Sequence, residues 1–196
     1  ARLRQALDGP AKPEVLLLPE LWNTGYALDR IDALADENGA RTIGFMANFA
    51  REHRVHIVAG SVADRIGSSV RNTCYVFDRN GALVADYAKI HLFGLMDEDK
   101  HLSAGDRAGS FTLGGIPAGV MICYDIRFPE LARKLALGGA KILFVPAEWP
   151  KPRLHHWRTL LMARAIENQM YVAACNRTGS SNGTDFCGHS MIIDPW

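Results

Sequence analysis

Short, nearly continuous apolar runs such as "VLLLP" and "ILFVP" recur along the chain with helical segments between them. This alternation constrains the fold more than any other feature of the sequence. Such runs are typical of strands that are buried on both faces of a sheet, and helices between them cover the sheet. The pattern predicts a layered α/β fold. Strands are expected at 14–20, 55–61, 119–123, 141–146, 170–176 and 188–196, and helices at 40–53, 129–137 and 152–169.

One segment adds antiparallel pairing to this plan. Residues 72–89 have the pattern of a hairpin, in which Asn80 and Gly81 supply the positive φ angles of a tight turn. The sheets are therefore expected to be mixed, and a loop is expected over 91–110. No stretch has the composition of a linker, which predicts a single domain over residues 1–196.

The two ends of the sequence are abrupt. The chain begins at Ala1 rather than at a methionine, and it stops at Trp196, directly after a predicted strand. We expect a partial domain, truncated at both termini. An unpaired sheet edge left by such a truncation favours aggregation.

Composition excludes several classes of function. Lys and Arg total 22 against 21 for Asp and Glu, and no basic run stands out, so nucleic acid and anionic membranes are not expected as partners. The apolar runs are too short to cross a bilayer. The four cysteines form no CxxC pair and are sparse for a disulfide scaffold, which favours reduced thiols and a cytoplasmic location. The histidines show no ligand spacing, so we expect neither a metal nor another cofactor.

Three reactive side chains stand at the ends of predicted strands: Glu20, Lys89 and Cys123. Ligands of α/β folds bind where strands end, so these three side chains are candidates for one site. A thiol can act as a nucleophile, a carboxylate as its base and an ammonium as a stabiliser of an oxyanion. A helix starting near Pro129 would favour a thiolate at Cys123, and the N–H of Tyr124 would lie where an oxyanion forms.

Each of these residues also has an ordinary structural interpretation. A single cysteine on a strand is most often a small buried hydrophobic residue. A glutamate after proline is commonly a solvated turn residue, and a lysine at the end of a hairpin commonly faces water. The residue types alone leave both interpretations open.

Longer motifs decide between them. The segments "LLLPELWNTGY", "DYAKIHLF" and "GVMICYDIRFPE", followed by "PAEWP" and "GHSMIIDP", resemble the nitrilase superfamily of carbon–nitrogen hydrolases over essentially the whole chain. The resemblance implies an α-β-β-α sandwich with mixed sheets and a homodimer or higher homo-oligomer. It also implies a catalytic triad of Glu20 as general base, Lys89 as oxyanion stabiliser and Cys123 as nucleophile.

The resemblance suggests Glu98 and Trp149 as further site residues, and their positions beside the motifs suggest Tyr26 and Arg127. Glu98, in "MDEDKHLSAGD", matches a second glutamate that orients the lysine and the leaving amine or water, although an acid-rich loop is often simply solvated. Tyr26 lines the pocket or packs under its loop. Arg127 binds a substrate carboxylate, or pairs with Glu130 or a nearby strand. Trp149 shapes the mouth of the pocket.

Within the superfamily, "CYDIRFPE" and "GHSMIIDPW" are most similar to the ω-amidases. That branch hydrolyses the terminal amide of small ω-amido dicarboxylic acids such as 2-oxoglutaramate, through a cysteine thioester, to the acid and ammonia. A nitrilase or an N-carbamoyl hydrolase would share the triad, so both remain alternatives. An inactive binding domain is the alternative of another class.

Overall fold

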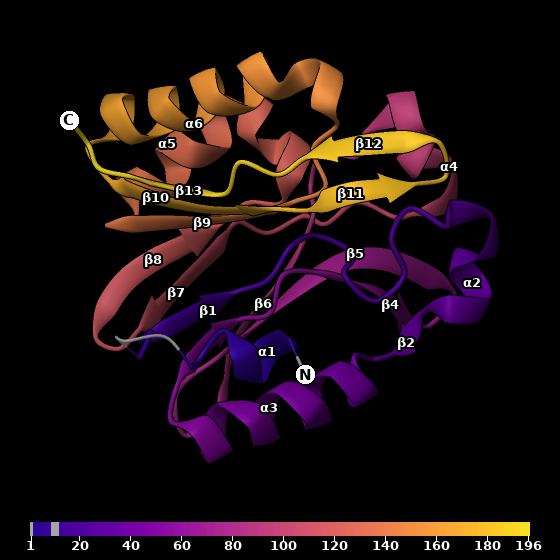
Figure 1. Cartoon of the computed structure of the whole chain (residues 1–196), viewed down its shortest axis with the longest axis horizontal. Coiled ribbons are helices and arrows are strands. Elements are labelled where there is room, and N and C mark those ends of the chain that lie inside the picture. The colour runs from indigo at the N-terminus through magenta and orange to yellow at the C-terminus, as the bar shows by residue number, and fades with distance from the viewer. Residues whose placement is uncertain (1, 9–11) are drawn as a thin grey trace.

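Two mixed β-sheets face each other in the computed structural model, which describes residues 2–8 and 12–196 (Figure 1). The first sheet has the order β1-β3-β5-β4-β2, with β6 paired to the long strand β5, and the second has the order β13-β10-β9-β8-β7. Parallel and antiparallel pairs occur in both sheets, as predicted. The strands of the first sheet are β1 (Val15–Leu17), β2 (Asp36–Glu37), β3 (His56–Val58), β4 (Val62–Ile66), β5 (Ser69–Phe77) and β6 (Leu83–Ala88). Those of the second are β7 (Gly109–Leu113), β8 (Ile116–Val120), β9 (Ile142–Ala147), β10 (Tyr171–Asn176) and β13 (Met191–Ile193).

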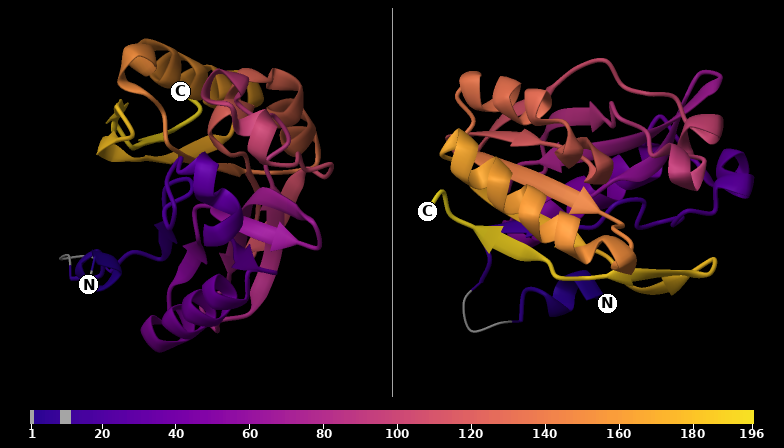
Figure 2. Two further views of the ribbon diagram at one scale, coloured as in Figure 1. Left: turned by 90° about the vertical axis from the view of Figure 1, so that its right-hand side faces the viewer. Right: turned by 90° about the horizontal axis from the view of Figure 1, so that it is seen from above.

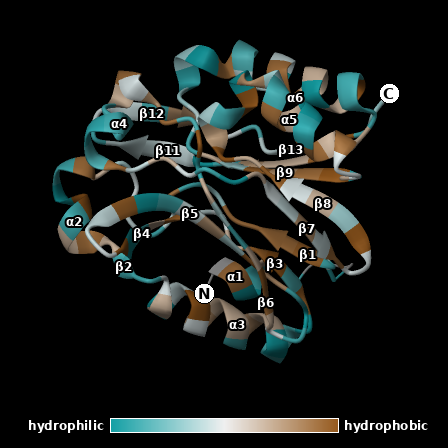
Figure 3. Ribbon diagram, turned by 180° about the vertical axis from the view of Figure 1, so that it is seen from behind, coloured by the Kyte–Doolittle hydropathy of each residue, from teal (hydrophilic) through white to brown (hydrophobic). Residues whose placement is uncertain are grey.

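Helices cover the outer faces of both sheets and complete an α-β-β-α sandwich. The helix α3 (Ala40–His53) lies on the first sheet, and α5 (Pro129–Leu137) lies beside α6 (Leu154–Asn168) on the second (Figures 1 and 2). Hydrophobic residues concentrate on the strands between these layers, and hydrophilic residues on the outward faces of the helices (Figure 3). The predicted fold class is therefore confirmed.

The hydrophobic core occupies the spaces between the layers. One cluster joins the two sheets to α5 and α6 and includes the buried residues Val76, Val120, Leu143 and Trp157. A second cluster lies between the first sheet and α3. Because Tyr87 of β6 and Val120 of β8 belong to the first cluster, the side chains that follow these two strands are placed at the edge of a rigid core.

The predicted helices agree closely with the structure, whereas several strands are shorter than expected. The predicted run 14–20 contains only the three residues of β1, and the run 119–123 is a strand only to Val120. Cys123 instead begins a 3₁₀ helix, η3 (Cys123–Arg127). The region predicted as a loop over 91–110 contains short helices and the start of β7. The elements there are η2 (Gly94–Met96) and α4 (Glu98–His101).

The predicted Asn-Gly turn of the first hairpin is wrong in its details. Gly81 has a φ of +82°, but Asn80 is not among the residues with positive φ in the described part of the chain. The Asp78 carboxylate accepts hydrogen bonds from the N–H groups of Asn80 (2.8 Å) and Ala82 (2.9 Å). An aspartate-anchored turn of this kind needs only one residue with positive φ.

A second Asn-Gly pair makes the tight hairpin instead. Asn182 and Gly183, with φ angles of +48° and +74°, join the antiparallel strands β11 and β12. Positive φ at both central residues is the signature of a two-residue hairpin loop. The elements not predicted from the sequence also include α1 (Arg2–Gln5), η1 (Leu28–Arg30), α2 (Ile31–Leu34), η4 (Lys151–Arg153), β11 (Thr178–Ser181) and β12 (Thr184–Cys187).

Within the described ranges, no helix is both long and apolar enough to cross a membrane. The prediction of one domain over residues 1–196 includes residue 1 and residues 9–11, which lie outside those ranges. It therefore stays a prediction.

Candidate active site

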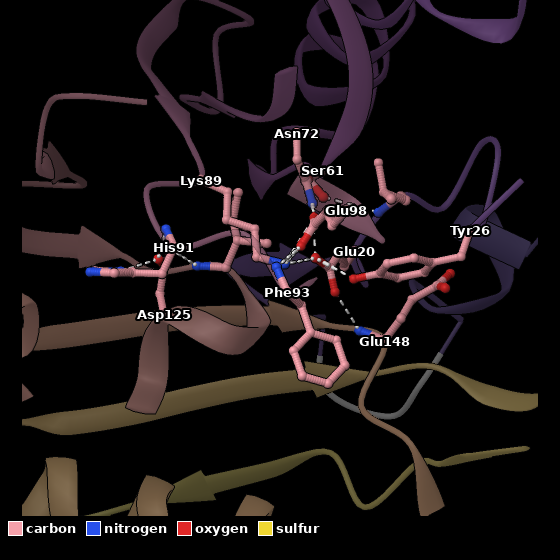
Figure 4. A network of polar contacts seen from close by, with 12 residues as sticks. Glu20, Tyr26, Ser61, Asn72, Lys89, His91, Phe93, Glu98, Asp125 and Glu148 are labelled. Carbon is pink, nitrogen blue, oxygen red and sulfur yellow. Dashed lines mark hydrogen bonds and ion pairs between the residues drawn. The ribbon is translucent and has the colours of Figure 1, made fainter. Parts of the chain in front are cut away.

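Three buried ionisable side chains meet where the two sheets face each other (Figure 4). Glu20 follows β1, Lys89 directly follows β6, and Glu98 is the first residue of α4; all three are fully buried. The Lys89 ammonium lies 2.8 Å from Glu20 Oε1 and 2.7 Å from Glu98 Oε2. Such a cluster is stable only if hydrogen bonds satisfy the charges that water no longer solvates.

Polar groups around the two carboxylates supply those bonds. Asn72, on β5, donates from Nδ2 to Glu20 Oε1 at 2.8 Å and to Glu98 Oε1 at 2.9 Å. The backbone N–H of Phe93 donates to Glu98 Oε2 at 2.7 Å. Asn72 and Lys89 thereby each bridge the two carboxylates and fix them beside the ammonium.

Glu20 is held by two more donors. The backbone N–H of Glu148, directly after β9, donates to Glu20 Oε2 at 2.9 Å. The Tyr26 hydroxyl donates to Glu20 Oε1 at 3.2 Å. Burial, with the charge of Glu20 adding to it, raises the pKa of Tyr26, so this hydroxyl remains a donor.

The charges determine which groups are protonated. Burial lowers the pKa of Lys89, but the carboxylates of Glu20 and Glu98 outweigh it, and the pKa is raised above its ordinary value. Burial raises the pKa of Glu98 and outweighs the opposing effect of Lys89. Lys89 is therefore a permanent cation at neutral pH, aimed at the site by two carboxylates.

Cys123 sits on a strained turn beyond the end of β8. Its φ is +48°, in the left-handed region, which costs a residue with a side chain about 1–3 kcal/mol. Two residues, Met121 and Ile122, separate it from the strand, and its side chain is buried. A sharp turn between a strand and a helix presents the nucleophile of many hydrolases at the edge of a sheet.

The Cys123 thiol is held in its protonated form. Burial and the Glu20 carboxylate, which interacts with the thiol, raise its pKa, and Lys89 opposes them only in part. The expectation of a thiolate favoured by a helix N-terminus is therefore wrong. The α-helix begins at Pro129, as predicted, but a 3₁₀ helix formed by Cys123–Arg127 separates it from the thiol. A thiol in this state needs a base before it can attack, and Glu20 is the carboxylate that interacts with it.

A second buried network ties the lysine segment to the cysteine turn. Asp125 accepts hydrogen bonds from the Tyr87 hydroxyl (2.7 Å) and the Ile122 N–H (2.9 Å) on Oδ2. On Oδ1 it accepts the His91 N–H at 2.9 Å and contacts His91 Nδ1 at 2.8 Å. Tyr87 and His91 flank Lys89, so Asp125 fixes Lys89 and Cys123 in relation to each other.

A small pocket with about 240 Å³ of empty volume opens beside Cys123. Aromatic rings and two guanidinium groups dominate its wall. The lining residues are Phe93, Cys123, Tyr124, Arg127, Glu148, Trp149, Pro150 and Arg153.

The predicted pocket residues fall into two groups. Tyr124, Arg127 and Trp149 line the pocket, whereas Tyr26 lies behind Glu20 and is not part of its wall. The Arg127 guanidinium contacts His156 Nδ1 at 3.0 Å and lies 5.2 Å from the Trp149 ring. The predicted alternative partner of Arg127, Glu130, forms neither an ion pair nor a hydrogen bond with it in the described ranges, where the guanidinium meets His156 instead.

Sequence reasoning missed several polar residues of the site. Asn72 and Asp125 act through contacts with residues far away in the chain, and Arg177 reaches Glu148 Oε1 at 2.8 Å. For Glu148 a signal existed, because this acid stands inside the apolar "FVPAEWP" segment next to Trp149. Arg153 could also have been predicted as a site residue, because it lies only four residues after Trp149 in the sequence.

In the part of the chain that the structure describes, no group of three His, Cys, Asp or Glu side chains is placed to hold a metal ion. The chemistry available from these residues is nucleophilic attack by a thiol, with a carboxylate base and a cation for the developing oxyanion.

Comparison with known proteins identifies the family. The family model for carbon-nitrogen hydrolases matches residues 3–196. The chain is a carbon–nitrogen hydrolase. It belongs to the nitrilase superfamily, and it is 56% identical over 183 residues to the 2-oxoglutaramate amidase of Bacillus subtilis (strain 168), covering 93% of this chain and 71% of that protein.

Two further matches support the same family. The omega-amidase YafV of Escherichia coli (strain K12) is 37% identical, over 96% of this hydrolase and 72% of YafV. The crystal structure of Saccharomyces cerevisiae Nit3, a member of branch 10 of the nitrilase superfamily, superposes with a TM-score of 0.91 at 28% identity, over 99% of this chain and 73% of Nit3. The sequence matches and the structural match therefore indicate the same fold and the same enzyme class.

Proposed function

We propose that this carbon–nitrogen hydrolase cleaves the terminal amide of small ω-amido dicarboxylic acids, such as 2-oxoglutaramate, to the acid and ammonia. The observation that carries the proposal is the small pocket, which is lined both by the nucleophilic thiol of Cys123 and by Arg127 and Arg153. An amide with a free carboxylate at its far end matches that combination. The name of the Bacillus subtilis relative supports the same substrate class.

The first half of the proposed reaction forms a thioester. Glu20 takes the proton of the Cys123 thiol, and the sulfur attacks the amide carbon. The Lys89 ammonium and the Tyr124 N–H stabilise the oxyanion of the tetrahedral intermediate. Glu20 then returns the proton to the amide nitrogen, and the carbon–nitrogen bond breaks to release ammonia. The burial of Glu20 and its 2.8 Å contact with Lys89 support these roles.

The second half hydrolyses the thioester. Glu20 takes a proton from water, and the resulting hydroxide attacks the thioester carbon. When the carbon–sulfur bond breaks, the proton passes to Cys123 and the carboxylic acid leaves. Glu98 holds Lys89 together with Glu20 and orients it for both tetrahedral intermediates, a role supported by its contacts of 3.0 and 2.7 Å with Nζ.

Arg127 is proposed to bind the substrate carboxylate, and Trp149 to shape the pocket beside it. The Arg127→Met variant should raise KM for carboxylated amides more than for neutral amides, because only the former lose a charge-assisted contact. An equal change in KM for both kinds of amide would argue against this role.

Ammonia release tests the function as a whole. The wild-type protein would be assayed with 2-oxoglutaramate, succinamate, a neutral aliphatic amide, a nitrile and an N-carbamoyl amino acid, with Cys123→Ala as the control. Preferential hydrolysis of 2-oxoglutaramate that disappears in Cys123→Ala is expected. A preference for the nitrile or for the carbamoyl compound would favour the corresponding alternative enzyme, and no activity on any compound would favour a binding domain.

Location and assembly complete the proposal. The four cysteines are free in the structure, which suits a reducing compartment, so we place the protein in the cytoplasm. Exposed apolar side chains near the ends of α5 and α6, among them Leu137 and Ile166, support a homodimer or higher homo-oligomer. Sedimentation equilibrium would measure the mass, and a monomer at micromolar concentration would contradict the assembly.

A further inference from the structure

Two arginines bring uncompensated positive charge to the pocket beside Cys123. Neither Arg127 nor Arg153 forms an ion pair with an acidic side chain in the residues that the structure covers. The pocket's own carboxyl group, Glu148, is already bound by Arg177 at 2.8 Å. Burial and the nearby Glu20 also raise the pKa of Glu148 to about 8, so this group adds little negative charge near pH 7.

The two guanidinium groups are held in different ways. Arg127 belongs to η3, the turn that begins with Cys123, and its guanidinium lies near the rings of Tyr124 (5.8 Å) and Trp149 (5.2 Å). Arg153 belongs to η4, and its guanidinium lies 5.4 Å from the Phe93 ring. The two arginines therefore reach the pocket from separate elements and can bind separate groups of one ligand.

The backbone of Arg153 is also fixed. Its carbonyl accepts a hydrogen bond from Trp149 Nε1 at 2.8 Å, and the Phe93 under its guanidinium is anchored through the bond from its N–H to Glu98. A guanidinium on a fixed stem loses less conformational freedom when it binds. Replacing only the side chain of Arg153 leaves the carbonyl contact in place.

A ligand that fits this pocket should offer a hydrogen-bond acceptor to each of the two guanidinium groups. One carboxylate is satisfied by the paired N–H groups of one guanidinium. A 2-oxo acid offers a further acceptor, the oxo oxygen, on the carbon next to its carboxylate. A 2-amino acid carries an ammonium group at that same carbon, which two guanidinium groups without acidic partners would repel.

We propose that Arg153 is a specificity-determining residue, which donates a hydrogen bond to the 2-oxo oxygen of the substrate and repels the 2-ammonium group of the corresponding amino acid, glutamine. This inference rests on the proposed function and adds to it. Arg127 binds the carboxylate that both compounds share. Arg153 discriminates between the 2-oxo acid and the 2-amino acid, so that the enzyme hydrolyses the former and leaves glutamine intact.

Three substrates that differ at one carbon test the assignment. 2-Oxoglutaramate carries an oxo group at that carbon, glutaramate carries two hydrogens, and glutamine carries an ammonium. Ammonia release would be measured for the wild type, Arg153→Met, Arg127→Met and a control, Arg158→Met. Arg158 is an exposed arginine of α6 outside the pocket wall, so its substitution removes the same charge at a neutral position.

The expected result is selective. Arg153→Met should lower kcat/KM for 2-oxoglutaramate by about 10- to 100-fold, as expected for one hydrogen bond from a charged donor. It should change glutaramate by less than about threefold and raise the rate on glutamine relative to 2-oxoglutaramate. Arg127→Met should weaken 2-oxoglutaramate and glutaramate alike, and Arg158→Met should change neither. Thermal unfolding of each variant checks that it is folded, and Arg153→Gln provides a second, polar replacement.

Two other results have distinct meanings. Equal losses on 2-oxoglutaramate and glutaramate in both Arg153 variants, or no loss on either, would overturn the role of Arg153 and leave the proposed function intact. A wild-type protein that releases ammonia from neither compound would overturn the proposed function, and the inference with it.

Discussion

Replacing Asp125 with asparagine should destabilise the protein and slow catalysis, although Asp125 lies outside the pocket wall. Each of its two oxygens accepts one backbone N–H, from His91 or from Ile122. Each oxygen also contacts one side-chain group, the His91 ring or the Tyr87 hydroxyl, that can act either as a hydrogen-bond donor or as an acceptor. The two backbone N–H groups can only donate. Asparagine offers one oxygen and one NH₂ group, so in either orientation one backbone N–H faces another donor.

The magnitude follows from that unpaired donor. Asp125 is fully buried, and a buried donor without a partner costs about 1–3 kcal/mol, to which the loss of a charged acceptor adds. We expect a total of about 3 kcal/mol. For a chain of this length, 1 kcal/mol corresponds to roughly 2–4 °C in Tm, so Tm should fall by roughly 6–12 °C. A displacement of Cys123 of about 1 Å would lower kcat about 100-fold.

Thermal unfolding followed by circular dichroism, together with steady-state ammonia release, measures both effects. Asp29→Asn is the matched control, because it makes the same chemical change at an exposed position and should shift Tm by no more than about 2 °C. A loss of kcat with little change in KM is expected for Asp125→Asn. If this variant melts within about 2 °C of the wild type and keeps its kcat, then Asp125 does not hold the turn.

Three further predictions concern the charged cluster. Lys89→Met leaves Glu20 and Glu98 without their cation and should lower kcat by at least about 100- to 1000-fold in steady-state assays; a variant with a tenth of the wild-type kcat would contradict the oxyanion role. Tyr26→Phe removes one hydrogen-bond donor to Glu20 and should lower kcat in steady-state assays, whereas an unchanged kcat would argue against a role for this contact. Glu148 binds its proton more tightly in the folded state, with a pKa of about 8 against 4.5, so its contribution to stability is lost as pH rises from about 4.5 to 8. Glu148→Gln does not titrate, so its Tm relative to the wild type should rise between pH 5 and pH 8, and a constant difference would refute the shift.

Local patterns predicted the helices well. The helix over 40–53 and the helix over 129–137 have the predicted bounds because their signals are contained in the segments themselves. Apolar residues repeat at helical spacing in the first, and a proline opens the second. The strand limits were less predictable, because a strand ends where its neighbour stops pairing, and that partner lies elsewhere in the chain.

The two Asn-Gly pairs show how surroundings decide a local signal. Asn182 and Gly183 form the tight turn, yet the strands that they join are polar and give no alternating apolar pattern. Asn80 and Gly81 lie between apolar strands, but Asp78 takes over the turn through its side chain. The dipeptide alone does not choose between these outcomes.

The candidate site was predictable in part. Residue types at strand ends nominated Glu20, Lys89 and Cys123, and family motifs supplied their proposed roles. The position of Asn72 was not predictable, because it depends on the register between β5 and β6. In that register the backbone N–H of Lys89 donates to the Asn72 carbonyl at 2.9 Å. A β-bulge in the same strand pair, between Val76 and Phe77, shifts this register, and no local pattern reports it.

The protonated state of Cys123 has a consequence for the lifetime of the enzyme. Peroxide and alkylating agents react with thiolates, and the first step of cysteine oxidation to sulfenic acid follows the thiolate fraction. Because burial and Glu20 raise the pKa of Cys123, that fraction is small between turnovers. We therefore expect the nucleophile to resist oxidative inactivation when the pocket is empty, and to become reactive only while a substrate occupies the pocket and Glu20 accepts the proton.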